Sequence, residues 1–365
     1  MLHFLLYNLM KSVNNVVVTA QKYKLLGGKN MSMKRFLVVA FAMLVGIMYA
    51  TTGFAAQEYH WKIGHIRPPG TEIDNDVKWF VDKVKEETNG RIIIDIYPAS
   101  QLGDYTVVQE RVSIGAVEMQ IACIGTTVTK ALQINTAPYL ATNWEEAKKL
   151  YDHNGVVYKA TTDLLANKEN IYVIAGWPSY FGGIALVKSV PAPGDPSVQK
   201  KVKIRVPPIK SYELTAQSLG YIATPIPWAE TFTAMQTGIV EGAIGAGAEG
   251  YYADFRDIIK YYLPVNDHLE MWYLYINKDL WNKLSDEDKN TLTKLGLQME
   301  EKRWQQAPKS QLNNEKHLAD YGISVVSFTQ DELNAMAKKV RDEVWPVIKK
   351  DIGEETFNKV MKEVK

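Results

Sequence analysis

An arginine at the end of an alternating strand pattern has the type and position best suited to binding chemistry. Residues 202–206 alternate apolar and basic side chains, with Arg205 next to last, and two prolines then stop the strand. In open α/β sheets, ligands bind beyond the carboxyl ends of the strands. A guanidinium there offers two parallel hydrogen bonds to a carboxylate. The alternative is a solvent-facing arginine on an edge strand.

A second candidate is the glycine run Gly245-Ala-Gly247-Ala-Glu-Gly250, a literal G-x-G-x-x-G. It follows a predicted strand and precedes a helical stretch, which is the outline of a dinucleotide-binding turn. However, it follows the third strand of its unit and not the first. Glycines also let the backbone approach any small ligand closely. A dinucleotide-binding enzyme therefore stays as the weaker alternative to a solute site.

Motifs of enzyme chemistry are otherwise missing from the sequence. There is no H-x-x-x-H pair, no G-x-S-x-G elbow and no phosphate-binding loop. The single cysteine, Cys123, rules out an intrachain disulfide and argues against a thiolate zinc site. The sequence thus favours a binding protein with no resident cofactor over an enzyme, although catalytic groups can also be brought together only in space.

The first 55 residues differ from the rest in charge and hydropathy. They hold six Lys or Arg and no acidic residue, which leaves 36 basic and 41 acidic residues, a net charge of −5, for the remainder. This mild negative charge argues against nucleic acid as a partner. Lys34 and Arg35 precede an apolar run and a small-residue site ending at Ala55, which predicts a signal peptide over residues 31–55. The alternative is a membrane anchor that is not cleaved. Residues 1–30 are interpreted as an extension that results from a start codon assigned too far upstream.

The remaining chain predicts two α/β lobes, each a mainly parallel sheet flanked by helices, with a ligand cleft between them. The predicted strands and helices of the first lobe are residues 60–66, 74–89, 91–97 and 117–122. Residues 202–244 give strand-helix-strand-helix-strand for the second lobe.

Two passages are expected to connect these lobes. The first is the glycine- and aromatic-rich stretch 176–183, which follows a strand at 171–175, and the second is a strand at 269–276. A long helix from Ser285 to Tyr321, broken near Pro308, is expected to brace them. The predicted lobes are 56–178 with 272–310, and 179–271 with 311–365.

Several of these segments match the signatures of one protein family. Residues 203–207 and 225–242, with 97–104 and 114–119 upstream, resemble the extracytoplasmic solute-binding proteins of TRAP transporters, the DctP-like family. The similarity covers nearly all of the chain after about residue 57. It implies a periplasmic receptor for a small organic acid that works with small and large integral membrane subunits, driven by an ion gradient. Fold analogy alone would also allow the receptor of an ATP-driven importer.

The resemblance implies roles for individual residues. Arg205 aligns with the carboxylate-binding arginine of the family. Sialic-acid-binding members carry a second arginine about twenty residues earlier, and residues 181–187 have none, which argues against that ligand. Keto-acid-binding members have a glutamate followed by an aromatic residue near Glu249 and Tyr251, and there the glutamate helps to hold a sodium ion. The alternative for Glu249 is an exposed loop carboxylate.

Aromatic residues are predicted to complete the walls of the cleft. The predicted substrate-binding set is therefore Arg205, Trp177, Phe181, Trp228, Glu249 and Tyr251. For Trp177, Phe181 and the neighbouring Tyr180, packing against a helix is the alternative. Such walls favour a hydrophobic or aromatic carboxylate over a sugar acid, but 2-oxo acids, hydroxy acids and dicarboxylates all stay open.

Overall fold

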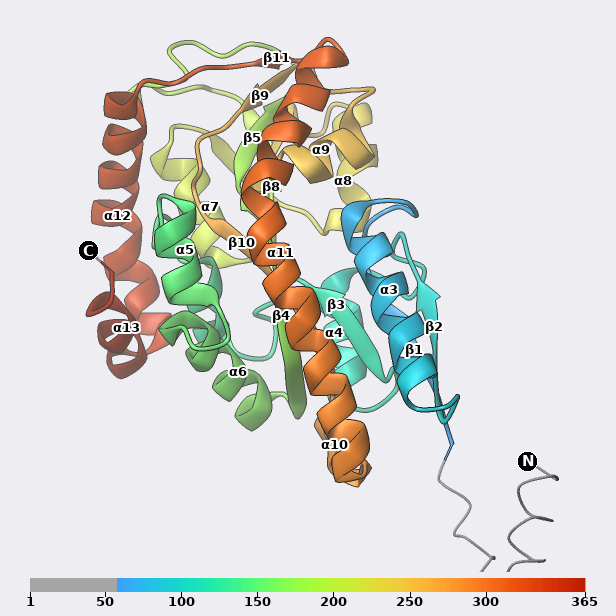
Figure 1. Ribbon diagram of the computed structural model, residues 1–365. Helices are drawn as coiled ribbons and strands as arrows, with labels where there is room; N and C mark the ends of the chain where they lie inside the picture. The colour runs from blue at the N-terminus through green and yellow to red at the C-terminus, as the bar shows by residue number, and fades with distance from the viewer. Residues whose placement is uncertain (1–57, 365) are drawn as a thin grey trace, which may run out of the picture. The chain divides into compact units, whose positions relative to one another are not determined.

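Two mixed β-sheets organise the residues that the computed structural model describes, 58–364 (Figure 1). Sheet A has the strand order β2-β1-β3-β10-β4, and sheet B has the order β11-β9-β5-β8-β6-β7. The strands of sheet A are β1 (Tyr59–Gly64), β2 (Ile92–Tyr97), β3 (Met119–Ala122), β4 (Ile171–Phe181) and β10 (Leu269–Asn277). The strands of sheet B are β5 (Gly183–Leu186), β6 (Lys203–Val206), β7 (Ile222–Pro225), β8 (Gly242–Ala246), β9 (Tyr261–Leu263) and β11 (Ser324–Val325).

Each sheet combines parallel strands with one antiparallel strand that comes from a lobe crossing. In sheet A, β1 pairs in parallel with β2 and β3, while β10 runs antiparallel to β3 and β4. In sheet B, β6 pairs in parallel with β7 and β8, while β5 runs antiparallel to β8 and β9. The parallel β1–β2 and β6–β7 pairs come from the strand-helix-strand units that the alternating sequence pattern predicts.

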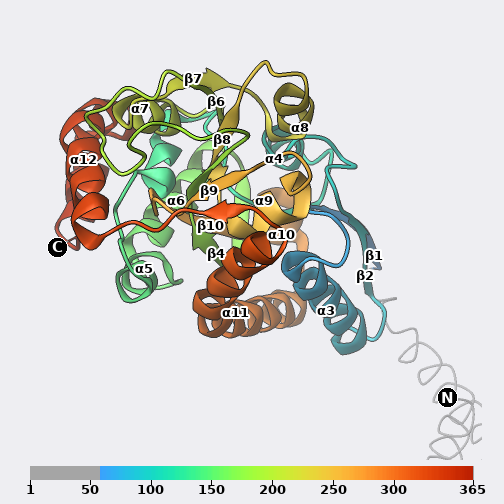
Figure 2. The same cartoon turned by 90° about the horizontal axis from the view of Figure 1, so that it is seen from above.

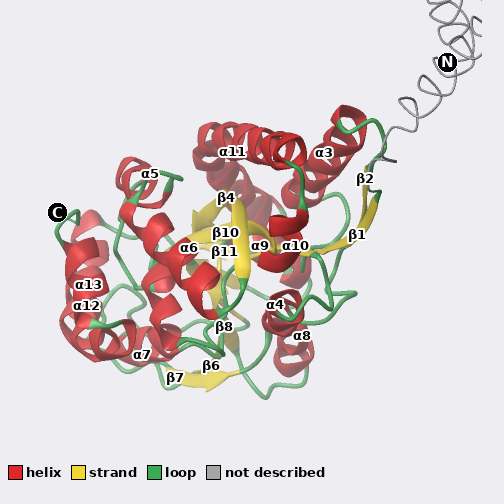
Figure 3. Ribbon diagram, turned by 90° about the horizontal axis from the view of Figure 1, so that it is seen from below, coloured by secondary structure: helices red, strands yellow, loops and turns green. Residues whose placement is uncertain are grey.

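Helices cover both sheets, as Figure 3 shows in red around the yellow strands. In chain order they are α3 (Glu72–Glu87), α4 (Tyr105–Ser113), the 3-10 helix η1 (Lys130–Thr136), α5 (Trp144–Tyr151), α6 (Val156–Lys168), α7 (Lys210–Ser218), α8 (Trp228–Gln236), α9 (Ala248–Phe255), α10 (Lys278–Lys283), α11 (Asp286–Asp320), α12 (Gln330–Ile352) and α13 (Glu354–Met361). Thr329 and Glu332 form the capping box that opens α12. No helix within residues 58–364 is both long and apolar enough to cross a membrane.

The first lobe crossing differs from the expectation. The stretch up to Phe181 was expected to leave the sheet at Gly176, but β4 continues to Phe181 and pairs with β10 along its whole length. Pro178 fits inside this strand because the pairing shifts register next to it, between Glu270 and Met271. The crossing itself is reduced to Gly182, between β4 and β5.

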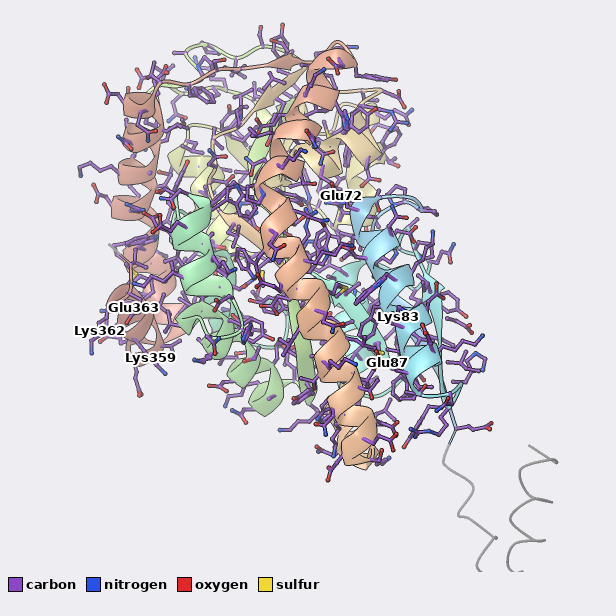
Figure 4. All side chains as sticks on the ribbon, viewed as in Figure 1. Glu72, Lys83, Glu87, Lys359, Lys362 and Glu363 are labelled. Atoms are coloured by element: carbon purple, nitrogen blue, oxygen red, sulfur yellow. The ribbon has the colours of Figure 1, made fainter. Side chains whose placement is uncertain are left out.

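The long helix α11 also differs from the expectation, since it runs through Pro308 without a break. It packs against β4, α3, α9 and β11, so it contacts elements attached to both sheets (Figure 1). Ion pairs fix α3 to α11 near the two ends of α3: Arg303 contacts Glu72 at 2.6 Å and Lys294 contacts Glu87 at 2.8 Å. Figure 4 labels both glutamates. We attribute the continuity of the helix through Pro308 to these tertiary contacts, which outweigh the one lost backbone hydrogen bond.

The C-terminal helices also contact both lobes. The α12 helix packs against α7, beside which it lies in Figure 2, and against η1, and α13 packs against α12 and α6. Since α7 follows a strand of sheet B and α6 precedes a strand of sheet A, this segment touches both lobes. The expected signal peptide and its cleavage after Ala55 lie outside the described residues.

Candidate functional site

A pocket lies between the two lobes, at the carboxyl ends of β1 and β6. The cavity is small, with about 20 Å³ open to the centres of water molecules. On the sheet A side, which comprises the chain before Gly182 and β10, the lining residues are Ile66, Arg67, Tyr105, Cys123, Ile124, Thr136, Tyr180, Glu270 and Trp272. Those attached to sheet B are Arg205, Pro207, Ile209, Tyr212, Trp228 and Gly245. Both lobes therefore contribute polar and aromatic side chains to one site.

Arg205 lies in this pocket as a buried cation without an acidic partner. Its strand β6 is flanked by β7 and β8, so it is not an edge strand, and the side chain is only 1% exposed. Nε donates to the Ile226 carbonyl at 2.8 Å and Nη1 to the Ile244 carbonyl at 3.3 Å. Within residues 58–364, no Asp or Glu oxygen lies within 4.0 Å of this guanidinium. Burial consequently lowers the pKa of Arg205.

Arg67 is a second buried arginine in the same pocket, and it does have acidic partners. It follows β1, and its Nε donates to Glu249 Oε2 at 2.8 Å while Nη2 donates to the Tyr180 hydroxyl at 3.0 Å. Asp254 lies 3.6 Å from Nη1. Burial acts to lower the pKa of Arg67, but the neighbouring negative charges, led by Glu249, outweigh it and the pKa is raised. Burial raises the pKa of Asp254 to about 6, although Arg67 acts against this shift.

The second lobe crossing carries a buried histidine between two carboxylates. His268 Nδ1 lies 2.8 Å from Asp267 Oδ2, and Nε2 lies 2.9 Å from Glu270 Oε2. Burial acts to lower the pKa of His268, but the two carboxylates outweigh it and raise the pKa to about 10. Glu270, which lines the pocket, also accepts hydrogen bonds from Trp272 at 3.0 Å and Tyr212 at 3.2 Å. Its charge and hydrogen-bonding capacity are thus met within the protein.

Tyr180, which was weighed between pocket and packing, lines the pocket. Of the aromatic residues in the predicted substrate-binding set, Trp228 alone lines it. Its ring lies under both arginines, with its centroid 4.8 Å from Arg67 Cζ and 5.4 Å from Arg205 Cζ. Trp177 instead donates to Asp76 at 3.0 Å, behind β4. Phe181 packs edge-on against Trp144, with ring centroids 5.2 Å apart.

Tyr251 and Glu249 lie on α9, behind the lining residues. The Tyr251 hydroxyl donates to the Ala243 carbonyl at 2.8 Å and thereby fixes α9 to β8. Glu249 is 7% exposed, so it is not the exposed loop carboxylate of the alternative interpretation. It contacts the pocket through Arg67 and not directly.

The residues around Glu249 do not fit the sodium ion that the resemblance implies. The Glu249 carboxylate already binds the Arg67 guanidinium, and a metal ion there would lie beside a fixed positive charge. No cluster of three or more His, Cys, Asp or Glu suited to a metal occurs in residues 58–364.

The glycine run has a local packing role. Gly245 has φ +91°, which an L side chain rarely adopts, and it lines the pocket. Gly250 lies against Arg67, and a Cβ there would overlap Nη2 of the guanidinium. The third glycine therefore makes room for an arginine side chain.

Sequence reasoning missed Arg67 and the Asp267–His268–Glu270 group. A usable signal was present for Arg67, because it follows the first strand just before Pro68 and Pro69, as Arg205 precedes Pro207 and Pro208. The carboxyl-end rule that selected Arg205 applies equally to Arg67. The sequence holds no comparable signal for His268, because Asp267 and Glu270 raise its pKa only when all three side chains are buried together.

Comparisons with known proteins agree with this architecture. A solute-binding protein of Roseobacter denitrificans is 24% identical over 311 residues, which cover 82% of this chain and 92% of that protein. The crystal structure of a TRAP periplasmic solute binding protein from Desulfovibrio salexigens with bound orotic acid has a TM-score of 0.76 at 20% identity, over 84% of this chain and 99% of that one. The sugar acid binding protein of Advenella mimigardefordensis, in complex with galactonate, also has a TM-score of 0.76, at 18% identity, over 85% of this chain and 98% of that one.

A family profile matches the chain from the end of β1 to the end of α12. The match covers residues 63–351 and is described as bacterial extracellular solute-binding protein, family 7. It includes all of sheet B, sheet A apart from the first four residues of β1, both lobe crossings and every residue that lines the pocket. The chain therefore belongs to the DctP family, the family 7 extracellular solute-binding proteins of bacteria.

Proposed function

We propose that this chain is a periplasmic receptor that binds a small organic acid between its lobes, with the carboxylate of the acid on Arg205. One observation carries the proposal: Arg205 is 1% exposed, lines the pocket and has no acidic partner in the described chain. A buried charge is costly unless it is paired. A carboxylate solute supplies the missing negative charge and can accept two hydrogen bonds from one guanidinium.

The ligands of the structural relatives support an acid. Orotic acid and galactonate, named for two of them, share a carboxylate and differ in nearly everything else. In this chain, burial raises the pKa of the Tyr105 and Tyr212 hydroxyls well above the ordinary value, so both stay protonated at neutral pH. The Tyr105 hydroxyl can thus donate to the rest of the solute, while the Tyr212 hydroxyl, which donates to Glu270, can accept from it.

Binding requires the lobes to move apart and close again. The pocket leaves about 20 Å³ for the centres of water molecules, which is space for about one water and not for an organic acid. Near Gly182 the two crossings pack so closely that a Cβ would overlap the His268 ring. A solute that contacts both lobes favours a closed state in which the lobes enclose it, by its higher affinity for that state.

The proposed pathway begins with export and ends at the membrane. The signal peptide is cleaved after Ala55, and the mature receptor delivers its solute to the small and large membrane subunits of an ion-gradient-driven TRAP transporter. A receptor for an ATP-driven importer is the second candidate; the description of the Desulfovibrio salexigens structure as a TRAP protein favours the first. N-terminal sequencing of the periplasmic fraction tests the cleavage, and recovery of the uncleaved chain there would contradict it.

The test of the binding proposal starts from protein refolded without solute. A thermal-shift screen over 2-oxo acids, hydroxy acids, dicarboxylates and aromatic acids identifies candidates, and calorimetry measures their affinity. Removing one member of a buried charge pair costs about 2–5 kcal/mol, so Arg205→Ala should weaken binding about 30-fold to several-thousand-fold.

The matched control is Lys203→Ala, which removes a cation from the same strand at an exposed position. It should leave the affinity within about twofold, since exposed charges contribute little. Failure of every acid to bind, or equal affinity in Arg205→Ala and wild type, would reject the proposal. Chemical conversion of the bound acid would instead indicate an enzyme.

A further inference from the structure

The position of Arg67 is fixed by the lobe that contains sheet A. It follows β1, and its carbonyl accepts a hydrogen bond from Ala99 N at 2.9 Å, in the loop after β2. Two residues earlier, His65 N donates to the Tyr97 carbonyl at 3.1 Å. The backbone around Arg67 therefore belongs to the β1–β2 edge and moves with it.

The carboxylates that hold the Arg67 side chain come from the other lobe. Glu249 and Asp254 both lie on α9, which follows strand β8 of sheet B. The Glu249 contact is 2.8 Å and the Asp254 contact is 3.6 Å. Gly250 supplies the space that the guanidinium occupies against this helix. The ion pair thus joins two lobes and cannot persist when they separate.

Two tryptophans, one from each lobe, enclose the guanidinium. Trp228 on α8 lies 4.8 Å from Arg67 Cζ, and Trp272 on β10 lies 5.2 Å from it. Arg67 is 1% exposed as a result. Charges in such a water-poor site interact more strongly than at the surface, and leaving one of them unpaired is costly.

We propose that Arg67 is a positioning residue that latches the lobes together, by an ion pair with Glu249 that forms on closure. The latch supplies part of the free energy that favours the closed state before any solute binds. This proposal rests on the lobe closure of the proposed function but does not depend on which solute is bound. Arg205, by contrast, makes its hydrogen bonds within the described chain to the Ile226 and Ile244 carbonyls, which lie on the sheet B side like Arg205 itself.

The test measures lobe separation in the mature protein without solute. Nitroxide labels at the exposed positions Asp82 on α3 and Thr233 on α8 report the distance between the lobes by pulsed electron resonance. Every variant carries the same Cys123→Ala background, so the labels attach only at the two introduced cysteines. Because no solute is present, the result can be interpreted even if the organic-acid proposal fails.

We expect a closed population in the wild type and a shift of Arg67→Met toward the open distance, with the closed-to-open ratio falling about tenfold or more. Glu249→Gln should produce a similar shift with Arg67 still in place, and it provides the answer if Arg67→Met does not fold. The double variant should deviate from the sum of the two single effects, because the two residues form one pair.

Arg303→Met is the matched control. Arg303 is also buried, lies 4.2 Å above the ring of Trp177 and pairs with a glutamate, Glu72. Its partners belong to α3, to β4 and to its own helix α11, and none belongs to sheet B, so its loss should lower stability without shifting the lobe distance. Folded Arg67→Met and Glu249→Gln variants with the wild-type distance distribution would overturn the proposal. A shift of equal size in Arg303→Met would overturn it as well.

Discussion

Arg67 and Arg205 are both buried in one pocket and both lie against Trp228, yet their electrostatic surroundings are opposite. Arg67 has Glu249 and Asp254 beside it, and its pKa is raised. Arg205 has only carbonyl acceptors, and its pKa is lowered because burial is not compensated. The protein itself supplies the counter-charge of Arg67. We propose that a solute supplies that of Arg205, so that Arg67 serves the assembly of the site and Arg205 serves recognition.

The largest expected effect is on stability and distinguishes the two arginines directly. Arg67→Met leaves Glu249 without its buried partner, and breaking such a pair typically costs about 3–5 kcal/mol. Arg205→Met removes a cation that has no acidic partner, so we expect a change below about 1 kcal/mol in the free energy of unfolding. Urea unfolding at pH 7.5 measures both. Equal losses in the two variants would erase the proposed difference.

The next effect concerns the solute and sharpens the role of Arg205. A ligand acid should lose about 2–5 kcal/mol of binding free energy in Arg205→Ala, while its amide analogue should lose much less. Arg205→Lys should recover only part, because an ammonium cannot reproduce the two-pronged contact. Calorimetry on the two proteins and the two ligands gives the coupling energy. A coupling near zero would remove the anchor role of Arg205.

A smaller effect should follow the charge of His268. Its folded pKa of about 10 lies above the ordinary value of 6.5, so its contribution to stability is complete below pH 6.5 and is lost as the pH rises through about 10. We expect wild type to lose about 2–4 kcal/mol relative to His268→Gln between pH 6 and pH 10. Parallel pH profiles for the two proteins in urea unfolding would disprove the charged histidine.

The smallest expected effect tests whether Glu249 alone satisfies Arg67. Asp254 has a folded pKa of about 6 against 3.8 ordinarily, so its stabilising contribution is present below pH 3.8 and is lost as the pH rises through about 6. Relative to wild type, Asp254→Asn should therefore gain about 1–2 kcal/mol between pH 4 and pH 7. Unfolding free energies at the two pH values measure this. A relative loss would mean that Arg67 needs both carboxylates.

Much of the architecture could be predicted from local patterns. The alternation at residues 202–206 predicts β6, because this signal lies within a few residues. The prediction for the first lobe crossing was wrong, because Gly176 and Pro178 are typical of a loop. Pairing with β10, about ninety residues later, holds these residues in a strand.

The residues of the candidate site also differ in how far the sequence predicts their roles. Arg205 could be selected from the sequence, because its strand, its neighbours and the prolines that end the strand are contiguous. Trp177 and Phe181 could not be assigned, because an aromatic side chain suits a core and a pocket equally well. Only the packing of β4 against its neighbours decides that these two face away from the pocket.

The sequence alone therefore determined the alternation of strands and helices in residues 202–244, the two-lobed α/β fold and the place of Arg205 near the carboxyl end of its strand. The tertiary structure decided which charges meet. Arg67 and Glu249 are 182 positions apart and on different lobes, and neither carries a local mark of the other. The pair exists because the two lobes are in contact, and it is significant because both side chains are then removed from water, where a charge without a partner is costly.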